Sequence, residues 1–189
     1  MTKDVYETIP LMESERFLLR SLNDKKDAED LLKVYSDEKA VPFFNTDNCH
    51  GEDFHYTTME QMKKAMEFWK FSYQQKFFVR WAIEDKKKKE VIGTIELFHR
   101  SANDYYDCCG LLRLDLRSDY EIAEDITEVL SAILPKVKEM FLCDKIATKA
   151  VTAAKERAGA LETLGFQPSE EPLIGDDGTK YDSYYVMEL

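Results

Sequence analysis

The sequence predicts an α/β protein built around a single mixed sheet of about six or seven strands, with helices flanking the sheet. Two observations support this fold class. Runs with strand and helix periodicity alternate along the chain in the order β-α-α-β-β-β-α-β-α-β-β. The 189 residues are 44% hydrophobic, enough for one core, and no Pro-, Gly- or Ser-rich stretch divides them. We therefore expect one domain over residues 1–189.

The first third of the chain is predicted to form a strand followed by two helices. Residues 16–21 form a β-rich run, and the Asn-Asp pair that follows can cap a helix over residues 27–35. Thr57 or Thr58 can cap the second helix. Methionines recur there at helical spacing, which is more typical of a buried helix face than of a cofactor site: Met59, Met62 and Met66.

The middle of the chain predicts three strands. Residues 77–84 and 91–99 form a hairpin, and the lysine run over residues 86–89 is typical of a solvated hairpin tip. Gly93 within the second strand indicates a bulge or close packing. Residues 110–116 alternate leucines with charged residues, which predicts a strand with only one buried face.

The last third predicts a long helix, a strand, a second helix and two closing strands. Apolar residues recur at helical spacing from about residue 118 to residue 141, and Pro135 should kink that helix because it removes a backbone donor. The remaining elements are expected over residues 145–151 (strand), 153–164 (helix, ended by Gly165), 166–173 (strand) and 183–189 (strand).

The composition disfavours several classes of function. A net charge of −11 disfavours nucleic acid and anionic membranes, because both attract clustered Lys and Arg. No apolar run approaches the roughly 18–20 residues that cross a bilayer, and the N-terminus is polar where a signal peptide would be apolar, so we expect a cytoplasmic protein. The three histidines and four cysteines lack metal-ligand spacing, so no metal site is expected.

The element order, together with three segments, resembles the GNAT superfamily of N-acetyltransferases, specifically the Rim-type branch related to ribosomal-protein N-terminal acetyltransferases. The segments are SERFLLRSLNDKKDAEDLLKVYSDE, EVIGTIEL and ALETLGF. The resemblance implies the GNAT fold, in which the strands near Leu114 and Ala147 are parallel neighbours that splay apart. It also implies direct transfer of an acetyl group from acetyl-coenzyme A to a primary amine, on a small molecule or a peptide.

In the family, a glycine-containing turn at the start of a helix binds the cofactor's pyrophosphate through free N–H groups. The matching segment here, LDLRSDYEIAEDITEVL, has no glycine. A second family position, at the start of the helix before LGF, often carries Asn and Ser, and Ala154 and Arg157 stand there instead. The resemblance implies these cofactor-binding candidates: Leu114, Leu116, Arg117, Ile122, Ala123, Glu124, Asp125, Ile126, Ala154 and Arg157.

The same turn is acidic, and two interpretations of its acids are open. A carboxylate about 4 Å from a phosphate charge would oppose it by about 4 kcal/mol at an effective dielectric of 20. Alternatively, the acids complement the helix dipole, and Ser118 with Glu121 forms a capping box. The acids are Asp119, Glu121, Glu124, Asp125 and Glu128.

The candidate catalytic residue is Glu96, on the strand that supplies a general base in some family members. An amine attacks only when neutral, so Glu96 or a water that it holds would take the proton. The alternative is an ordinary strand glutamate facing solvent. No tyrosine stands before LGF to protonate the leaving thiolate, because Glu162 and Thr163 occupy those positions. Phe44, His55 and Tyr56 are the candidate substrate residues, in a segment that borders the acceptor cleft in this branch or that simply packs as a surface loop.

Two functions from different classes therefore compete. The first is an acyl-coenzyme A-dependent N-acetyltransferase. The second is a non-catalytic protein of the same fold that has lost normal acetyl-coenzyme A binding and serves a binding or interaction role. The glycine-free, acidic turn distinguishes them, because cofactor binding requires that turn to accept a phosphate. The sequence leaves the acceptor amine undefined and a homodimer open.

Overall fold

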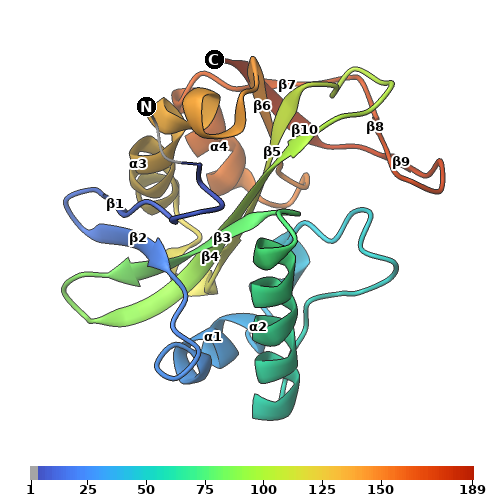
Figure 1. Ribbon diagram of the computed structural model, residues 1–189. Helices are drawn as coiled ribbons and strands as arrows, with labels where there is room; N and C mark the ends of the chain where they lie inside the picture. Colours follow the sequence, from blue (N-terminus) through green and yellow to red (C-terminus); the bar gives the residue numbers. More distant parts are fainter. Residues whose placement is uncertain (1–3) are drawn as a thin grey trace.

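The computed structural model describes residues 4–189 as a central sheet with helices on both faces (Figure 1). The main sheet has eight strands in the order β1-β2-β3-β4-β5-β6-β10-β7, and β8 pairs with β9 separately. The strands are β1 (Met12–Glu13), β2 (Phe17–Ser21), β3 (Val79–Asp85), β4 (Glu90–Arg100), β5 (Cys109–Leu116), β6 (Lys145–Lys149), β7 (Gln167–Pro168), β8 (Leu173–Ile174), β9 (Lys180–Tyr181) and β10 (Tyr184–Glu188). The α-helices are α1 (Ala28–Tyr35), α2 (Met59–Gln74), α3 (Ala123–Phe141) and α4 (Lys155–Thr163).

One strand pair gives the sheet its mixed character. β5 and β6 run parallel, and their residues pair from Cys109 with Lys145 as far as Leu112 with Thr148. β5 continues to Leu116 without further pairing to β6. The two strands therefore separate beyond Leu112, which confirms the splayed parallel pair. The other neighbours in this sheet are antiparallel.

The chain near the C-terminus differs from the sequence prediction. One strand was expected over residues 166–173, but β7 and β8 are two separate strands that belong to different sheets. Pro168 and Pro172 explain this interruption, since proline has no N–H to donate to a strand neighbour. The main sheet exceeds six or seven strands because β1 and β7, of two residues each, extend its edges.

The two faces of the sheet carry separate apolar clusters. The leucines of β5 (Leu112, Leu114 and Leu116) belong to the cluster that includes the apolar residues of α3 and α4. α1 and α2 contribute to the second cluster, which includes Ala82 of β3. The predicted methionine face of α2 is confirmed, because Met62 and Met66 are buried in that second cluster.

Two of the three predicted helix caps differ from expectation. Thr58 caps α2 in a capping box with Gln61, as predicted. α1 begins without a side-chain cap, and Asn23 instead accepts hydrogen bonds from the two amides of the preceding turn. α3 begins at Ala123, five residues later than expected, and its N-cap residue Ile122 makes no side-chain capping bond. Residues 118–120 form a separate 3-10 turn.

The predicted capping box of Ser118 and Glu121 is therefore wrong. The Ser118 amide donates to Asp37 (2.9 Å), and the Glu121 carboxylate is engaged by Arg157. These longer-range partners replace the local cap, which is why the helix starts later. α3 then runs as one helix through Pro135, and the kink stays a prediction.

Gly93 shows both features that were predicted for it. The pairing of β3 with β4 shifts register between Ile83 and Glu84, which marks a bulge beside Gly93. A Cβ atom added at Gly93 would lie 2.2 Å from the carbonyl oxygen of Asp115 on β5. Only glycine therefore allows β4 to approach β5 this closely.

We expect Gly93→Ala to lower the free energy of unfolding by about 1–3 kcal/mol or more, because the new methyl group meets backbone that cannot easily yield. Gly159→Ala is the matched control. No atom lies within 4 Å of the added Cβ in α4, and alanine should stabilise the helix by about 0.5–1 kcal/mol. Urea unfolding of the two variants and the parent measures both effects; a Gly93→Ala protein as stable as the parent would contradict the close approach.

Candidate active site

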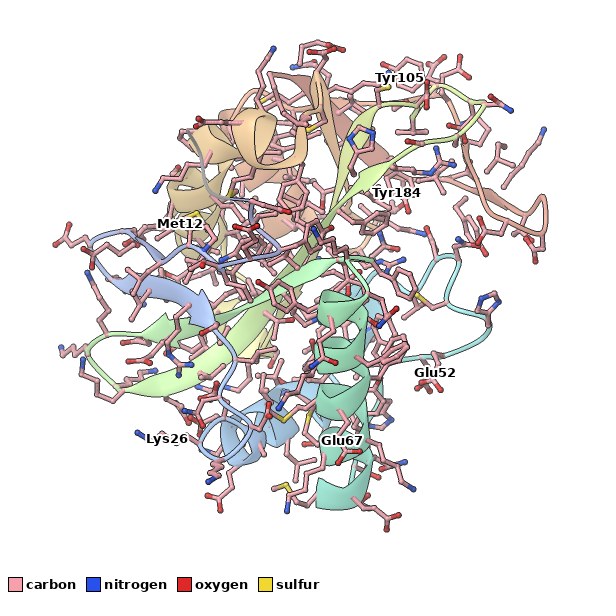
Figure 2. The ribbon with its side chains drawn as sticks, in the orientation of Figure 1. Met12, Lys26, Glu52, Glu67, Tyr105 and Tyr184 are labelled. Atoms are coloured by element: carbon pink, nitrogen blue, oxygen red, sulfur yellow. The ribbon has the colours of Figure 1, made fainter. Side chains whose placement is uncertain are left out.

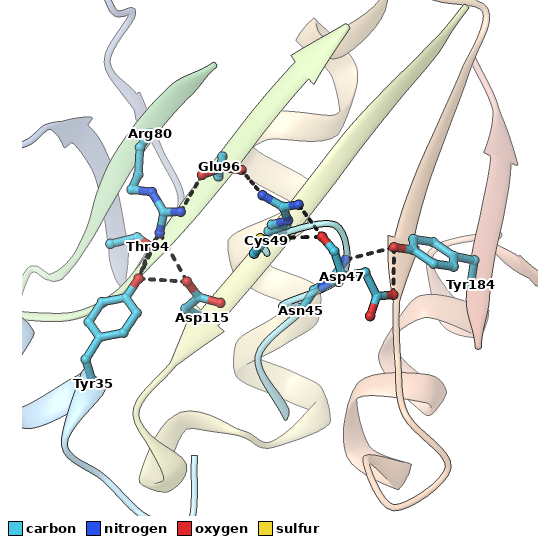
Figure 3. A network of polar contacts seen from close by, with 10 residues as sticks. Tyr35, Asn45, Asp47, Cys49, Arg80, Thr94, Glu96, Asp115 and Tyr184 are labelled. Carbon is cyan, nitrogen blue, oxygen red and sulfur yellow. Dashed lines mark hydrogen bonds and ion pairs between the residues drawn. The ribbon is translucent and has the colours of Figure 1, made fainter. Parts of the chain in front are cut away.

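Three charged side chains lie side by side across three neighbouring strands. Arg80 of β3 stands opposite Glu96 of β4, and Glu96 stands opposite Arg113 of β5. Arg80 Nη2 donates to Glu96 Oε2, and Arg113 Nη1 donates to Glu96 Oε1 (2.7 Å), as Figure 3 shows. Glu96 is only 1% exposed. The solvent-facing alternative for Glu96 is therefore wrong, because two guanidinium groups compensate a buried carboxylate.

A second buried carboxylate, that of Asp115, joins this network through Arg80. Asp115 Oδ2 accepts hydrogen bonds from the Tyr35 hydroxyl (2.7 Å) and from Arg80 Nη1 (3.1 Å). Arg80 Nη1 also donates to the Thr94 hydroxyl (2.8 Å). Asp115 is fully buried, so β5 does not have the single buried face predicted from its sequence. Residues from α1 and β3 hydrogen-bond one oxygen of this buried carboxylate, whereas Asp115 Oδ1 has no hydrogen-bond partner among the described residues.

The electrostatics of the network keep its central carboxylate ionised. Burial opposes ionisation of Glu96, but the charges and hydrogen bonds of Arg80 and Arg113 outweigh it and hold the Glu96 pKa below its ordinary value. Burial raises the pKa of Tyr35 well above its ordinary value, so its hydroxyl remains a donor. The Arg80 guanidinium also stacks 4.2 Å from the ring of Trp69.

A pocket of about 850 Å³ opens over this network. Arg80, Glu96 and Arg113 line it, together with α2 and the segment over residues 48–56. That segment extends away from the body of the protein beside α2, where Figure 2 labels Glu52. His55 and Tyr56, two of the candidate substrate residues, also line the pocket.

The third candidate, Phe44, is not in the pocket lining. It is buried and packs against Tyr35, with ring centroids 5.3 Å apart. Phe44 is therefore a core residue beside the pocket segment and does not face the pocket.

Asp47 anchors the pocket segment where β5 and β6 separate. Its carboxylate accepts hydrogen bonds from Lys149 of β6 (2.6 and 2.8 Å) and from the Tyr184 hydroxyl of β10 (3.1 Å). Its carbonyl oxygen accepts from Arg113 Nη2 (2.9 Å). One loop residue thus contacts three strands. Figure 3 shows its contact with Tyr184.

Sequence reasoning missed Arg80, Asp47, Lys149 and Tyr184. A signal existed for Arg80, because the predicted hairpin register brings it close to Glu96. The other three come from distant segments, and no local pattern joins them.

The start of α3 can accept an anion. The backbone N–H groups of Glu124 and Asp125 donate no hydrogen bond to any residue within 4–189, and a helix N-terminus carries partial positive charge. The Ala123 N–H instead donates to Glu156 of α4 (2.9 Å). Two free donors in the first turn fit a phosphate group such as those of coenzyme A.

The acids of this turn are mostly paired, which reduces the repulsion expected from the sequence. Four of the five accept hydrogen bonds from arginine side chains or backbone: Asp119 from Arg117, Glu121 from Arg157, and Asp125 and Glu128 from Arg16. Among the described residues, Glu124 alone of the five lacks such a partner.

The structure brings most cofactor candidates together, at the C-terminal end of β5 and the N-terminal ends of α3 and α4. Arg157 Nη1 donates to the Leu114 carbonyl (2.9 Å), and Glu156 beside it caps α3. Arg117 is held by Asp119 and Glu90. Ile122 is 43% exposed beside the turn, whereas other apolar candidates are buried: Leu114, Leu116, Ile126 and Ala154.

Residues 4–189 contain neither a metal-binding cluster nor a membrane-spanning helix. No group of three or more His, Cys, Asp or Glu side chains in this range could hold a metal ion. No helix in the same range has the length and apolar character needed to cross a membrane.

The splayed sheet, the anion-accepting helix start and the adjacent pocket define an acetyltransferase-type α/β domain, and comparison with known proteins specifies the family. Residues 16–167 match the family described as "Acetyltransferase (GNAT) domain". The protein belongs to this GNAT acetyltransferase family. It is 30% identical over 182 residues to the "Uncharacterized N-acetyltransferase YoaA" of Bacillus subtilis (strain 168), covering 92% of this chain and 93% of that protein.

Solved structures show the same fold at low identity. RimJ from Mycobacterium smegmatis, solved in complex with CoA-disulfide, superposes with a TM-score of 0.71 at 12% identity, covering 95% of this chain and 87% of RimJ. The ribosomal-protein-S5-alanine acetyltransferase from Vibrio fischeri gives a TM-score of 0.67 at 14% identity, with 95% and 96% coverage. These similarities place the chain among GNAT folds that include ribosomal-protein acetyltransferases.

The lowered pKa of Glu96 predicts how stability depends on pH. A carboxylate with a lowered folded-state pKa contributes stability that is present above its ordinary pKa of 4.5 and is lost as pH falls through the lower value. At pH 7, Glu96→Gln should lower the free energy of unfolding by about 3–5 kcal/mol, because the arginines lose their buried counter-charge. Urea unfolding between pH 7 and pH 3.5 should show the gap between parent and variant narrowing below pH 4.5; a gap independent of pH would contradict the assignment.

Proposed function

We propose that this protein is an N-acetyltransferase that transfers an acetyl group from acetyl-coenzyme A to a primary amine, on a small molecule or a peptide. The observation that carries the proposal is the position of the pocket. Its lining residue Arg113 directly follows Leu112, the last residue of β5 that pairs with β6. The acceptor pocket and the splayed strands therefore meet at one point.

The acceptor side of the site suits an amine. A primary amine is mostly a cation near neutral pH, and the chain is acidic overall, with Glu52 and Asp53 exposed at the pocket. Aromatic rings supply apolar walls, among them Trp69 of α2 and Phe78, the residue before β3.

On the donor side, the free amides of Glu124 and Asp125 would hold a phosphate group of coenzyme A. Leu114 and Leu116 of β5 would flank the rest of the cofactor, with Arg157 of α4 and Ala154, the residue before α4. When bound, acetyl-coenzyme A supplies a thioester carbonyl that a neutral amine can attack directly. The protein contributes orientation, by bringing donor and acceptor to the two sides of β5.

Glu96 is the proposed proton acceptor, directly or through a water that it holds. Its ionised state at neutral pH lets it bind the ammonium form of the substrate. Arg80 and Arg113 lower its pKa and so make it a weak base, which is why the proposal passes the proton onward to water.

A second candidate function is a non-catalytic GNAT-fold protein with a binding role. One observation favours it: the Arg157 guanidinium, paired with Glu121, already bonds the Leu114 carbonyl where β5 leaves β6. Calorimetry with acetyl-coenzyme A distinguishes the two functions, since cofactor binding must precede transfer. Absence of binding by the folded protein would refute the enzyme and support the second candidate.

Glu96→Gln should lower turnover by roughly a hundredfold or more while leaving acetyl-coenzyme A affinity nearly unchanged, because the residue acts in the chemical step. The assay uses an amine that the parent demonstrably acetylates. Glu84→Gln is the matched control, since Glu84 is a carboxylate of neighbouring β3 that pairs with Arg20 and does not line the pocket. Equal turnover in parent and Glu96→Gln would exclude Glu96 from proton transfer.

A further inference from the structure

A side chain from α4 contacts β5 at the point where β5 is no longer paired with β6. Beyond Leu112 the backbone of β5 has no β6 neighbour, and its buried carbonyl groups need donors from elsewhere. Arg157, in the first turn of α4, supplies one to Leu114 O (2.9 Å). Arg157 is 2% exposed, so its guanidinium is an interior group of the fold.

Glu121 neutralises this buried cation. Arg157 Nε donates to Glu121 Oε1 and Nη2 donates to Oε2, both at 2.7 Å, which is a bidentate pair. Arg157 Nη1 also donates to the Phe43 carbonyl at 3.0 Å. All three guanidinium nitrogens are therefore engaged, and the contact joins β5, α4, the turn before α3, and the segment leading to the pocket.

Glu156, the residue before Arg157, occupies an N–H donor at the start of α3. Glu156 accepts the Ala123 N–H at 2.9 Å, so a carboxylate already occupies the first amide of the helix start. An incoming phosphate would compete with that carboxylate for the same end of α3. One turn of α4 thus supplies an arginine at the strand gap and an acid at the helix start.

We propose that the Arg157–Glu121 pair is an internal latch that closes the cofactor side of the site and must open before acyl-coenzyme A binds. This inference rests on the proposed function. The latch occupies the Leu114 carbonyl and ties it to the start of α3, the two places where the family resemblance puts the cofactor. Because Arg157 also contacts Phe43, opening the latch releases the segment that leads to the acceptor pocket, so cofactor entry loosens the acceptor side.

The test removes both partners together. Replacing only one would leave a buried charge unpaired and could unfold the protein. The double variant Glu121→Ala/Arg157→Ala keeps the net charge of the chain, so long-range electrostatics stay constant. Arg100→Ala/Asp104→Ala is the matched control, because it removes another bidentate, mostly buried pair from the β4–β5 hairpin, away from the gap. Circular dichroism verifies that each variant is folded.

Calorimetric titration with coenzyme A, and separately with acetyl-coenzyme A, should show at least tenfold tighter binding to the latch variant than to the parent. The control variant should bind as the parent does. Equal affinity of the parent and latch variant would overturn the latch, and if the parent still acetylates an amine, the proposed function would stand. Weaker binding by the latch variant would also overturn it and make Arg157 a direct cofactor contact. No binding by any folded form would overturn both the latch and the proposed function.

Discussion

The separation of β5 from β6 after Leu112 is the constraint on which the rest of the site depends. A buried strand that loses its neighbour exposes backbone groups that must find other hydrogen-bond partners. On one side of the separation Arg157 takes the Leu114 carbonyl, and on the other Asp47 links Arg113 to Lys149. Side chains from α4 and from the segment between α1 and α2 therefore make the hydrogen bonds at the gap in the sheet.

β5 connects the two sides of the site because its residues alternate between the faces of the sheet. Its leucines pack into the core with α3, while Arg113 and Asp115 enter the polar network below the pocket. A small shift of β5 would therefore act on both the cofactor and acceptor sides. Gly93 restricts such a shift, because β4 lies too close to β5 for any side chain there.

The buried charges favour a defined geometry more than they favour stability. Ion pairs removed from water gain little net free energy, yet breaking one partner is costly. The Arg80–Glu96–Arg113 row fixes the order of three strands at the pocket floor, and the Arg157–Glu121 pair fixes the approach of α4 to β5. Both arrangements hold the side chains of the site in one geometry, because any conformation that leaves one buried charge without its partner costs free energy.

The sequence by itself determined the order of the main strands and the four helices, the hairpin with its lysine tip, the methionine face of α2 and the close packing at Gly93. These features depend on local periodicity, turn residues and the absence of a side chain, which can be read over a few positions. The resemblance in motif order added the splayed parallel pair. It also suggested Glu96 as the catalytic residue, which stays a proposal.

Only the tertiary structure decided what the charged residues do. Ser118 and Glu121 satisfied a local capping pattern, but Asp37 and Arg157 are stronger long-range partners for them. Glu96 was open to a solvent-facing interpretation until Arg80 and Arg113 were found on either side of it. The physical reason is that a buried charge requires compensation from whatever residue the fold brings near, and that residue is distant in the sequence.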